Sequence, residues 1–314
     1  MDIFERNYLI GEKEAGVRID TFLSAKLKTS RSQVKKYIQD GFVTINHQQV
    51  KPKTVIKPGD EIRIYIKNPH SEINDEWPAY KIPLNIIYED DFIIVINKPP
   101  GITVHPTVDE RKKTLVNILL SHSKQLSNIP DPVRRGVVHR LDKDTTGCVV
   151  FAKTDEILLN LKHQFKKRLV KKKYYAIARG VMRKNYYEID APIRRHPINR
   201  LKMSVGKTEG KPSKTFIYLK DTTKHFSFVE AEPITGRTHQ IRVHLASISY
   251  PILGDKIYGK SLKMPEGLNP PERHMLHSFY LSFYHPATHE KVNFYAEIPD
   301  DMKNMWNYLK ENDV

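Results

Sequence analysis

The sequence of 314 residues contains a single cysteine. One thiol excludes an intramolecular disulfide framework, a four-thiolate zinc site and a thiolate-ligated iron–sulfur cluster. It is typical of a reducing compartment, and we expect a cytoplasmic protein. No apolar run approaches the length of about 18 residues that a membrane-spanning helix needs, so we expect no membrane partner. The first residues also lack the basic start and long apolar core of a signal peptide.

Acidic residues are scarce relative to basic ones. The chain has 36 Asp and Glu against 52 Lys and Arg, a formal net charge of +16. Such an excess favours a polyanionic partner, nucleic acid first of all. A bias toward solubility or a membrane-surface habit is the alternative. Because 39% of the residues are hydrophobic, wholesale disorder is not expected.

The sequence also lacks a phosphate-binding P-loop and a histidine pair with the spacing of zinc ligands. The only Gly-Lys-Thr, at residues 206–208, has no glycine five positions ahead of it and is therefore no P-loop. His239 and His244 lie five residues apart, a step that does not align two zinc ligands on a helix. Cys148 lies in a strand-like run and is expected in the core.

The composition changes between residues 68 and 82, which are polar, contain two prolines and show no periodicity. We interpret this stretch as a linker between a small domain at residues 13–67 and a large one at residues 83–314. Residues 13–67 hold twelve Lys and Arg against five Asp and Glu, nearly half of the net charge. The small domain is therefore the first candidate for binding RNA.

Within the small domain, apolar residues at helical spacing predict a helix around residues 19–27 and a second helix from Ser30 to Gly41. Two strands follow. The second helix carries Arg31, Lys35 and Lys36 on its polar face, as phosphate contacts would require. An ordinary solvated helix face is the alternative. The order of these elements resembles the S4-like RNA-binding module over roughly residues 16–66.

The large domain shows strands and helices without regular alternation. Strands are predicted before and after an acidic turn at residues 89–91, and at 148–153, 174–179 and 226–233. Helices are predicted at 113–122, from Thr154 onward and at 239–248. The helix after Thr154 is expected to bury Ile157, Leu161, Phe165 and Leu169. We therefore expect an α+β fold with a mixed, largely antiparallel sheet and flanking helices, beside a small α/β domain.

Two polar segments interrupt this pattern. In the first, residues 136–147, Asp142 lies between two strand-like runs, where a rigid catalytic group is wanted. Arg140 and Lys143 would favour its ionised form. The alternative is a carboxylate, Asp142 or Asp144, that only caps a turn.

In the second segment, residues 235–244, the spacing places Arg237, Gln240 and His244 on one helical face and Arg242 on a different arc. One arginine could pair with a catalytic carboxylate while another holds phosphate. The alternative is a basic, solvated helix.

Together these segments allow a family to be named. GVVHRLDKDTTG at 136–147 resembles the signature of the RluA-type pseudouridine synthases. Further motifs occur in the family's order: NKPPGITVHP, KKYYAIARG, PIRRHPINRLKMSV, TGRTHQIRVHLA, LGDKIYG and LHSFYLSFYHP. The KDTT wording and the RHPINR segment are most similar to the RluD branch, which modifies large-subunit ribosomal RNA. The resemblance spans about residues 83–300, and an S4-like module is its usual companion.

The resemblance implies an isomerase that converts uridine to pseudouridine in RNA without a cofactor or metal. Asp142 matches the catalytic aspartate, Arg242 its ion-pair partner and Tyr174 the tyrosine against the uracil ring. Whether Asp142 attacks C1′ or C6, or assists proton removal from the ribose, stays open. Arg140 matches the residue that fills the gap left by the flipped base. His139 and Arg237, within the same motifs, are expected to contact RNA.

Residues 162–173, directly before Tyr174, hold seven Lys and Arg in twelve positions. If Tyr174 lies in the pocket, then Lys166, Lys167 and Lys172 are expected at its rim, where they can clamp the RNA backbone. A solvated helix end is the alternative. The expected partner is large-subunit (23S) ribosomal RNA or the assembling particle (pre-50S), bound by a monomer. Two rival functions are an inactive RNA-binding or ribosome assembly factor, and a glycosidase or nuclease.

Overall fold

The computed structural model describes residues 3–27, 31–67, 83–107, 110, 113–123, 126–127, 134–199, 202–206, 209–259 and 269–312. The chain forms two compact units, residues 1–78 with 129–132, and residues 79–128 with 133–314. The predicted linker at 68–82 and the predicted helix cap Ser30 lie outside the described residues. In the described parts, no helix is long and apolar enough to cross a membrane.

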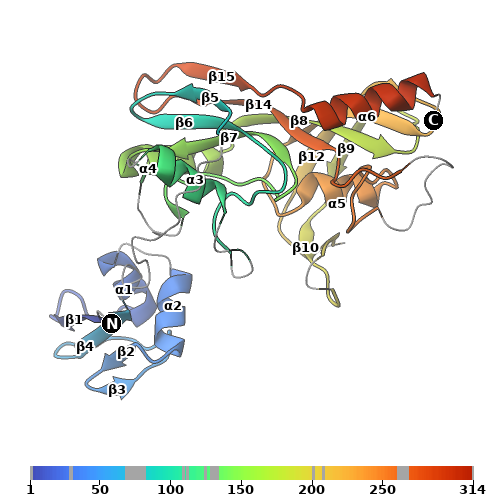
Figure 1. Cartoon of the computed structure of the whole chain (residues 1–314). Coiled ribbons are helices and arrows are strands. Elements are labelled where there is room, and N and C mark those ends of the chain that lie inside the picture. The colour runs from blue at the N-terminus through green and yellow to red at the C-terminus, as the bar shows by residue number, and fades with distance from the viewer. Residues whose placement is uncertain are drawn as a thin grey trace. The chain divides into compact units, whose positions relative to one another are not determined.

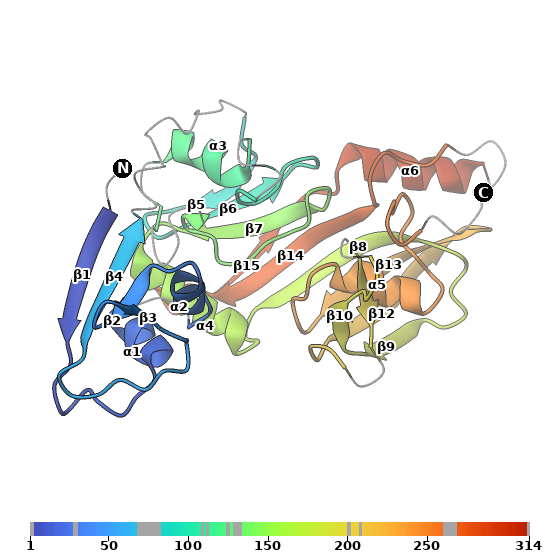
Figure 2. The same cartoon turned by 90° about the horizontal axis from the view of Figure 1, so that it is seen from below.

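The smaller unit has two helices packed on a four-stranded antiparallel sheet. Its helices are α1 (Ile19–Lys26) and α2 (Arg31–Gln39), and its strands follow the order β1 (Ile3–Leu9), β4 (Glu61–Lys67), β2 (Val43–Ile45), β3 (Gln48–Gln49). Figures 1 and 2 show both helices on the same face of this sheet. Ile19, Leu23 and Val34 form a core with Ile62 and Ile64 from β4, all fully buried.

Strand β1 lies ahead of the predicted start of this domain at residue 13 and was not predicted. The strand pairs with β4 from Ile3 opposite Lys67 to Leu9 opposite Glu61. Its partner lies more than fifty residues further along the chain, and its own sequence, IFERNYL, mixes charged with apolar residues. No local signal therefore distinguishes it from a loop.

The larger unit is built on a nine-stranded sheet. Its order is β5 (Ile86–Glu89), β6 (Ile93–Lys98), β7 (Thr146–Ala152), β14 (Leu276–Tyr284), β8 (Lys171–Arg179), β13 (Phe226–Pro233), β12 (Lys214–Thr222), β9 (Tyr186–Asp190), with β15 (Lys291–Tyr295) paired to β14. Every pairing is antiparallel except that of β7 with β14. The predicted α+β class with a mixed, largely antiparallel sheet is confirmed.

Helices cover both faces of this sheet, and alternate residues of β6 pack against helices on opposite faces. Ile94 and Ile96 pack in one cluster with α3 (Leu115–His122), whereas Ile93 and Val95 pack in another with α4 (Asp155–Lys166). Two further helices are α5 (Gln240–Ser247) and α6 (Asp300–Glu311). Helix α5 lies against β12, β13 and a short hairpin of β10 (Ile193–Arg195) and β11 (Met203–Val205), as Figure 2 shows.

Two helix predictions differ from the structure. Leu169 does not lie on the buried face of α4, because that helix ends at Lys166 and Arg168 turns the chain with a φ of 60°. Leu169 is consequently 52% exposed. Strand β8 then begins at Lys171, so three of the clustered lysines belong to a strand.

Arg237 precedes α5 and does not share a helical face with Gln240.

Candidate active site

The loop that carries Asp142 is fixed where it enters β7. Gly147 has a φ of 110°, and a Cβ on it would lie 2.2 Å from the carbonyl oxygen of Ser278 in β14. Only glycine allows the two strands to approach this closely. The Thr145 hydroxyl contacts His274 Nε2 at 2.8 Å, also beside β14. The backbone following Asp142 is thus held rigidly against the sheet.

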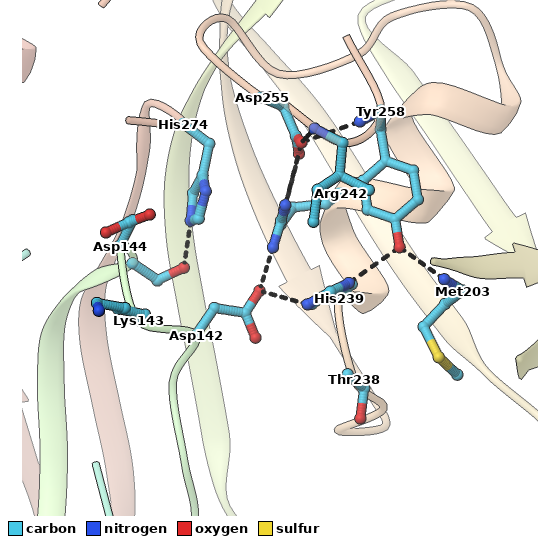
Figure 3. A network of polar contacts seen from close by, with 12 residues as sticks. Asp142, Lys143, Asp144, Met203, Thr238, His239, Arg242, Asp255, Tyr258 and His274 are labelled. Atoms are coloured by element: carbon cyan, nitrogen blue, oxygen red, sulfur yellow. Dashed lines mark hydrogen bonds and ion pairs between the residues drawn. The ribbon is translucent and has the colours of Figure 1, made fainter. Parts of the chain in front are cut away.

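Arg242 binds Asp142 from helix α5 and is itself clamped by a second carboxylate. Its Nη1 donates to Asp142 Oδ2 at 2.9 Å, while its Nε and Nη2 donate to Asp255 Oδ2 and Oδ1 at 2.7 and 3.0 Å (Figure 3). Asp255 is fully buried and also accepts the backbone N–H groups of Ile257 and Tyr258. This two-point clamp fixes the guanidinium and directs one N–H at Asp142.

The carboxyl group of Asp142 is held in its ionised form. Burial raises its pKa, but the positive charges of a protonated His239 and of Arg242, together with the hydrogen bond from Arg242, outweigh burial, and the pKa lies below its ordinary value. However, burial lowers the pKa of His239 itself, so Arg242 is the permanent counter-charge near neutral pH. Arg140 and Lys143, which were predicted to favour the ionised form of Asp142, are not among the groups that lower its pKa.

His239 lies immediately before α5 in a left-handed conformation, with a φ of 56°. Its Nε2 is 3.9 Å from Asp142 Oδ2, the same oxygen that Arg242 binds. Its Nδ1 lies 2.9 Å from the hydroxyl of Tyr258. In Figure 3 both contacts with Asp142 meet on one carboxylate oxygen, and the other oxygen points away from them.

Asp142, His239 and Arg242 lie on the shared wall of two cavities. The larger cavity, of about 540 Å³, is also lined by Tyr174, Ile241 and Leu276. The smaller, of about 360 Å³, is lined by residues of the Asp142 loop and by Arg273 and His274. The larger cavity therefore presents a carboxylate, a phenol and two apolar side chains.

Tyr174 projects from β8 into the larger cavity and is 8% exposed. Burial raises the pKa of its phenol to about 12; a hydrogen bond with Ser278 opposes this shift, and the negative charge of Asp142 adds to it. The phenol is therefore protonated near neutral pH and can donate a proton or a hydrogen bond, but cannot act as a base. The structure brings together Asp142, Arg242 and Tyr174, the three residues predicted as catalytic.

Arg140 and Arg237 lie at the rim of the larger cavity, whereas His139 is packed into its wall. Arg140 is exposed, and its Nη2 is 3.4 Å from Thr238 Oγ1. Arg237 is half-buried and donates to the carbonyl of Pro212.

The His139 ring stacks on Phe165 with centroids 4.7 Å apart, and its Nε2 accepts the N–H of Val150. Burial lowers the pKa of His139 to about 3, and the charge of Lys172 adds to this. His139 is thus uncharged near neutral pH and offers no cation to a phosphate.

Of the clustered lysines, Lys172 lies deepest. It lines the larger cavity, and its Nζ donates to the carbonyl of Thr235 at 3.4 Å. Burial lowers its pKa to about 8. Lys166 and Lys167 are exposed at the end of α4.

In the smaller unit, Lys35 and Lys36 are exposed on α2. Arg31 is half-exposed but also pairs with the fully buried Asp20, at 3.2 Å. Arg31 therefore has a structural role in joining α2 to α1, in addition to any contact with RNA.

Lys98, Asp255 and Tyr258 have site roles that the sequence analysis did not assign. Lys98 is fully buried, and its Nζ donates to three carbonyls, those of Pro99, Ile102 and Lys143, at 2.7 to 2.9 Å. Both NKPPGITVHP and LGDKIYG were recognised as motifs. A lysine or aspartate inside such a motif is the available signal. In the described residues, no group of three or more His, Cys, Asp or Glu side chains is arranged to hold a metal ion.

Comparison with known proteins gives consistent matches. The family model for RNA pseudouridylate synthases matches residues 92–247, and the S4 domain model matches residues 17–62. The chain is 42% identical over 309 residues to an uncharacterized RNA pseudouridine synthase of Aquifex aeolicus (strain VF5), covering 96% of each.

It is also 40% identical over 304 residues to ribosomal large subunit pseudouridine synthase D of Neisseria meningitidis serogroup A / serotype 4A, covering 94% of this chain and 79% of the relative. The structure of human RNA pseudouridylate synthase domain containing 1 aligns with a TM-score of 0.57 at 27% identity, covering 70% of this chain and 85% of that one.

Proposed function

The chain belongs to the RNA pseudouridine synthases, isomerases that act on RNA, and on that premise we propose that it converts uridines of large-subunit (23S) ribosomal RNA into pseudouridine with Asp142 as its catalytic carboxylate. The large-subunit substrate is suggested by the relatives named ribosomal large subunit pseudouridine synthase D. A ribosomal RNA substrate would place the enzyme in the cytoplasm. We expect the enzyme to act as a monomer.

The observation that carries the assignment is the state of Asp142. Arg242 binds one of its oxygens at 2.9 Å and lowers its pKa, while the other oxygen is left for the substrate (Figure 3). In the reaction the C1′–N1 bond breaks, the uracil turns, C5 bonds to C1′, the C5 proton leaves and N1 gains a proton. Attack at C1′, attack at C6 and proton removal from the ribose each require an ionised carboxylate. All three are therefore compatible with this geometry.

The remaining site residues suit the handling of an extruded base. Tyr174 can lie against the uracil and donate a proton, since its phenol stays protonated. Arg140, exposed at the rim, can fill the gap in the RNA stack with its planar guanidinium. Lys166, Lys167 and Lys172 can hold phosphates near the cavity, and Lys35 and Lys36 can do so from the S4 domain.

The test compares Asp142→Asn with wild type and with Asp144→Asn as the matched control. Pseudouridines are mapped as carbodiimide adducts in total RNA from cells with and without the protein, then from cells that carry each variant. We expect wild type and Asp144→Asn to produce the same large-subunit sites and Asp142→Asn to produce none, while it still binds large-subunit RNA. Retained conversion by Asp142→Asn would refute the catalytic assignment. Tight binding without conversion by the wild type would instead indicate an assembly factor, and uracil release would indicate a glycosidase.

A further inference from the structure

His239 lies in a chain of polar contacts that runs from strand β11 to Asp142. The backbone N–H of Met203, in strand β11, donates to the Tyr258 hydroxyl oxygen at 2.8 Å, and that hydroxyl lies 2.9 Å from His239 Nδ1. On the far side of the ring, His239 Nε2 faces Asp142 Oδ2 at 3.9 Å (Figure 3).

The contacts along this chain favour one tautomer of His239. The Tyr258 oxygen accepts from Met203, and among the described contacts of Tyr258, His239 Nδ1 is the acceptor within reach of its own O–H. A neutral imidazole has a single N–H, which is then on Nε2 and points at the catalytic carboxylate. His239 is neutral near neutral pH because burial lowers its pKa, and burial likewise raises the pKa of Tyr258 and keeps its phenol protonated.

One buried carboxylate fixes both groups that reach Asp142. Asp255 clamps the Arg242 guanidinium and also accepts the backbone N–H of Tyr258 at 3.0 Å. The Tyr258 ring lies in turn 5.3 Å from the guanidinium carbon of Arg242. The loop that carries Asp255 and Tyr258 thus fixes the positions of both Arg242 and the His239 ring. Both side chains face the same oxygen of Asp142.

We infer that His239 is a positioning residue for Asp142: its Nε2–H, oriented by the Tyr258 hydroxyl, donates to Oδ2 in the RNA-bound enzyme and turns the other oxygen toward the target nucleotide. The inference rests on the proposed function of Asp142. The present separation of 3.9 Å is longer than a hydrogen bond, so the contact has to shorten when RNA binds. Catalytic hydrogen bonds commonly tighten in this way when substrate is bound.

The geometry of His239 supplies a pair of variants that separates positioning from a purely structural role. His239→Asn places an amide where Nδ1 lies, fits the left-handed backbone and keeps a partner for Tyr258, but has no N–H near Asp142. His239→Gln reaches the position of Nε2 with an amide N–H, although glutamine fits a φ of 56° less well. A structural role alone ranks the Asn variant at least equal to the Gln variant, whereas the positioning role ranks Gln above Asn.

The experiment measures single-turnover rates of the full chain on large-subunit ribosomal RNA transcribed with uridine tritiated at C5, since each conversion releases the C5 hydrogen. At saturating RNA we expect His239→Asn to be about 10- to 100-fold slower than wild type, because small misplacements of a reacting group cost that much. His239→Gln should recover about fivefold or more of this loss. RNA dissociation constants should stay within about threefold of wild type, since the phosphate contacts are untouched. Rates of Gln no faster than those of Asn, or an equal loss in binding, would overturn the inference.

Tyr258→Phe provides a second, independent variant, because it keeps the ring over Arg242 and removes only the hydroxyl. It should slow turnover, and the double variant with His239→Asn should be no slower than His239→Asn alone, as expected for residues acting in one chain. Full additivity would mean that Tyr258 does not act through His239 and would refute the chain. Asp142→Asn in the same assay tests the proposed function separately: if it is inactive while the His239 series shows no ordering, only the present inference fails.

Discussion

The ammonium group of Lys98 lies 2.7 Å from the carbonyl oxygen of Lys143, the residue that follows Asp142. Two further carbonyls, those of Pro99 and Ile102, accept from the same nitrogen. A fully buried lysine therefore ties the end of β6 to the loop that carries the candidate catalytic carboxylate. The two segments are more than forty residues apart in the sequence.

Lys98→Met should destabilise the larger unit, since it leaves three carbonyls without their donor. We expect a loss of about 2 kcal/mol or more in the free energy of unfolding, because each unsatisfied buried acceptor costs about 1–3 kcal/mol. The turnover rate should fall as well, because the Asp142 loop loses an anchor. Chemical unfolding and single-turnover assays of the same preparation measure both effects. Unchanged stability and unchanged rate would contradict the anchoring role.

The contribution of Lys98 should also depend on pH. Burial lowers its pKa to about 7 in the folded protein, despite the opposing charges of Asp144 and Asp142, whereas an unfolded lysine titrates near 10.4. Between these values the unfolded chain binds more protons, so this group makes stability rise as pH increases from about 7 toward 10. The difference in unfolding free energy between wild type and Lys98→Met should therefore be larger at pH 9 than at pH 7. A difference that shrinks with pH would contradict the lowered pKa.

Much of this arrangement could be predicted from the sequence, and the limits have physical causes. The buried run of β6 and the capped helix α4 follow from local patterns, namely continuous apolar residues and a Thr154 hydroxyl that accepts the N–H of Ile157. The resemblance to the pseudouridine synthases predicted the pairing of Asp142 with Arg242, although they are 100 residues apart. The clamp by Asp255 was not predicted, because its effect on Arg242 arises only from tertiary packing.

His139 illustrates the opposite limit. Its place in the HRLD sequence predicts an RNA contact, which stays a prediction. The structure stacks the ring on Phe165 and uses Nε2 to accept the N–H of Val150. Sequence reports the presence of a titratable group but not its burial, and burial is what lowers the pKa of this imidazole to about 3. Similarly, β1 could not be recognised without its partner β4.

Tyr174→Phe should slow turnover more than it weakens RNA binding. The substitution keeps the aromatic ring in the cavity and removes only the hydroxyl, which stays protonated near neutral pH because its pKa is about 12. We expect a decrease in the single-turnover rate of about tenfold or more, in the range of general acid catalysis or below it. The dissociation constant for RNA should change by less than about threefold. If Tyr174→Phe matches wild type and Tyr174→Leu is the damaging change, the tyrosine acts by packing alone.

Lys172 should make RNA binding sensitive to pH. Its pKa is lowered by burial to about 8, so the free enzyme loses this cation as pH rises through 8, and binding to phosphate must then recover a proton. Affinity for large-subunit RNA should fall between pH 7 and 9 in the wild type and remain flatter in Lys172→Arg, which stays charged. Lys172→Met should reduce the slope of log affinity against log salt by about 1. Equal pH dependence in all three proteins would exclude a phosphate contact from Lys172.

The smaller unit should act as a separate RNA-binding domain. None of its described residues lines the two cavities around Asp142, and it has its own hydrophobic core. A protein beginning near Pro83 should therefore still convert uridine when RNA is in large excess. It should need more RNA to reach half of its maximal rate, because the tethered unit no longer raises the local concentration of RNA. Its binding should also depend less steeply on salt, since fewer counterions are released.

The comparison is a titration of rate against RNA concentration for both proteins at two salt concentrations. Lys35→Ala/Lys36→Ala in the full chain is the matched control, because both side chains are exposed on α2 and their loss leaves the fold intact. We expect this variant to shift the half-saturating RNA concentration in the same direction as the truncation and to keep the maximal rate. A folded but inactive truncation would mean that the smaller unit helps to build the active site. Identical curves for all three proteins would mean that the basic face of α2 is only a solvated surface.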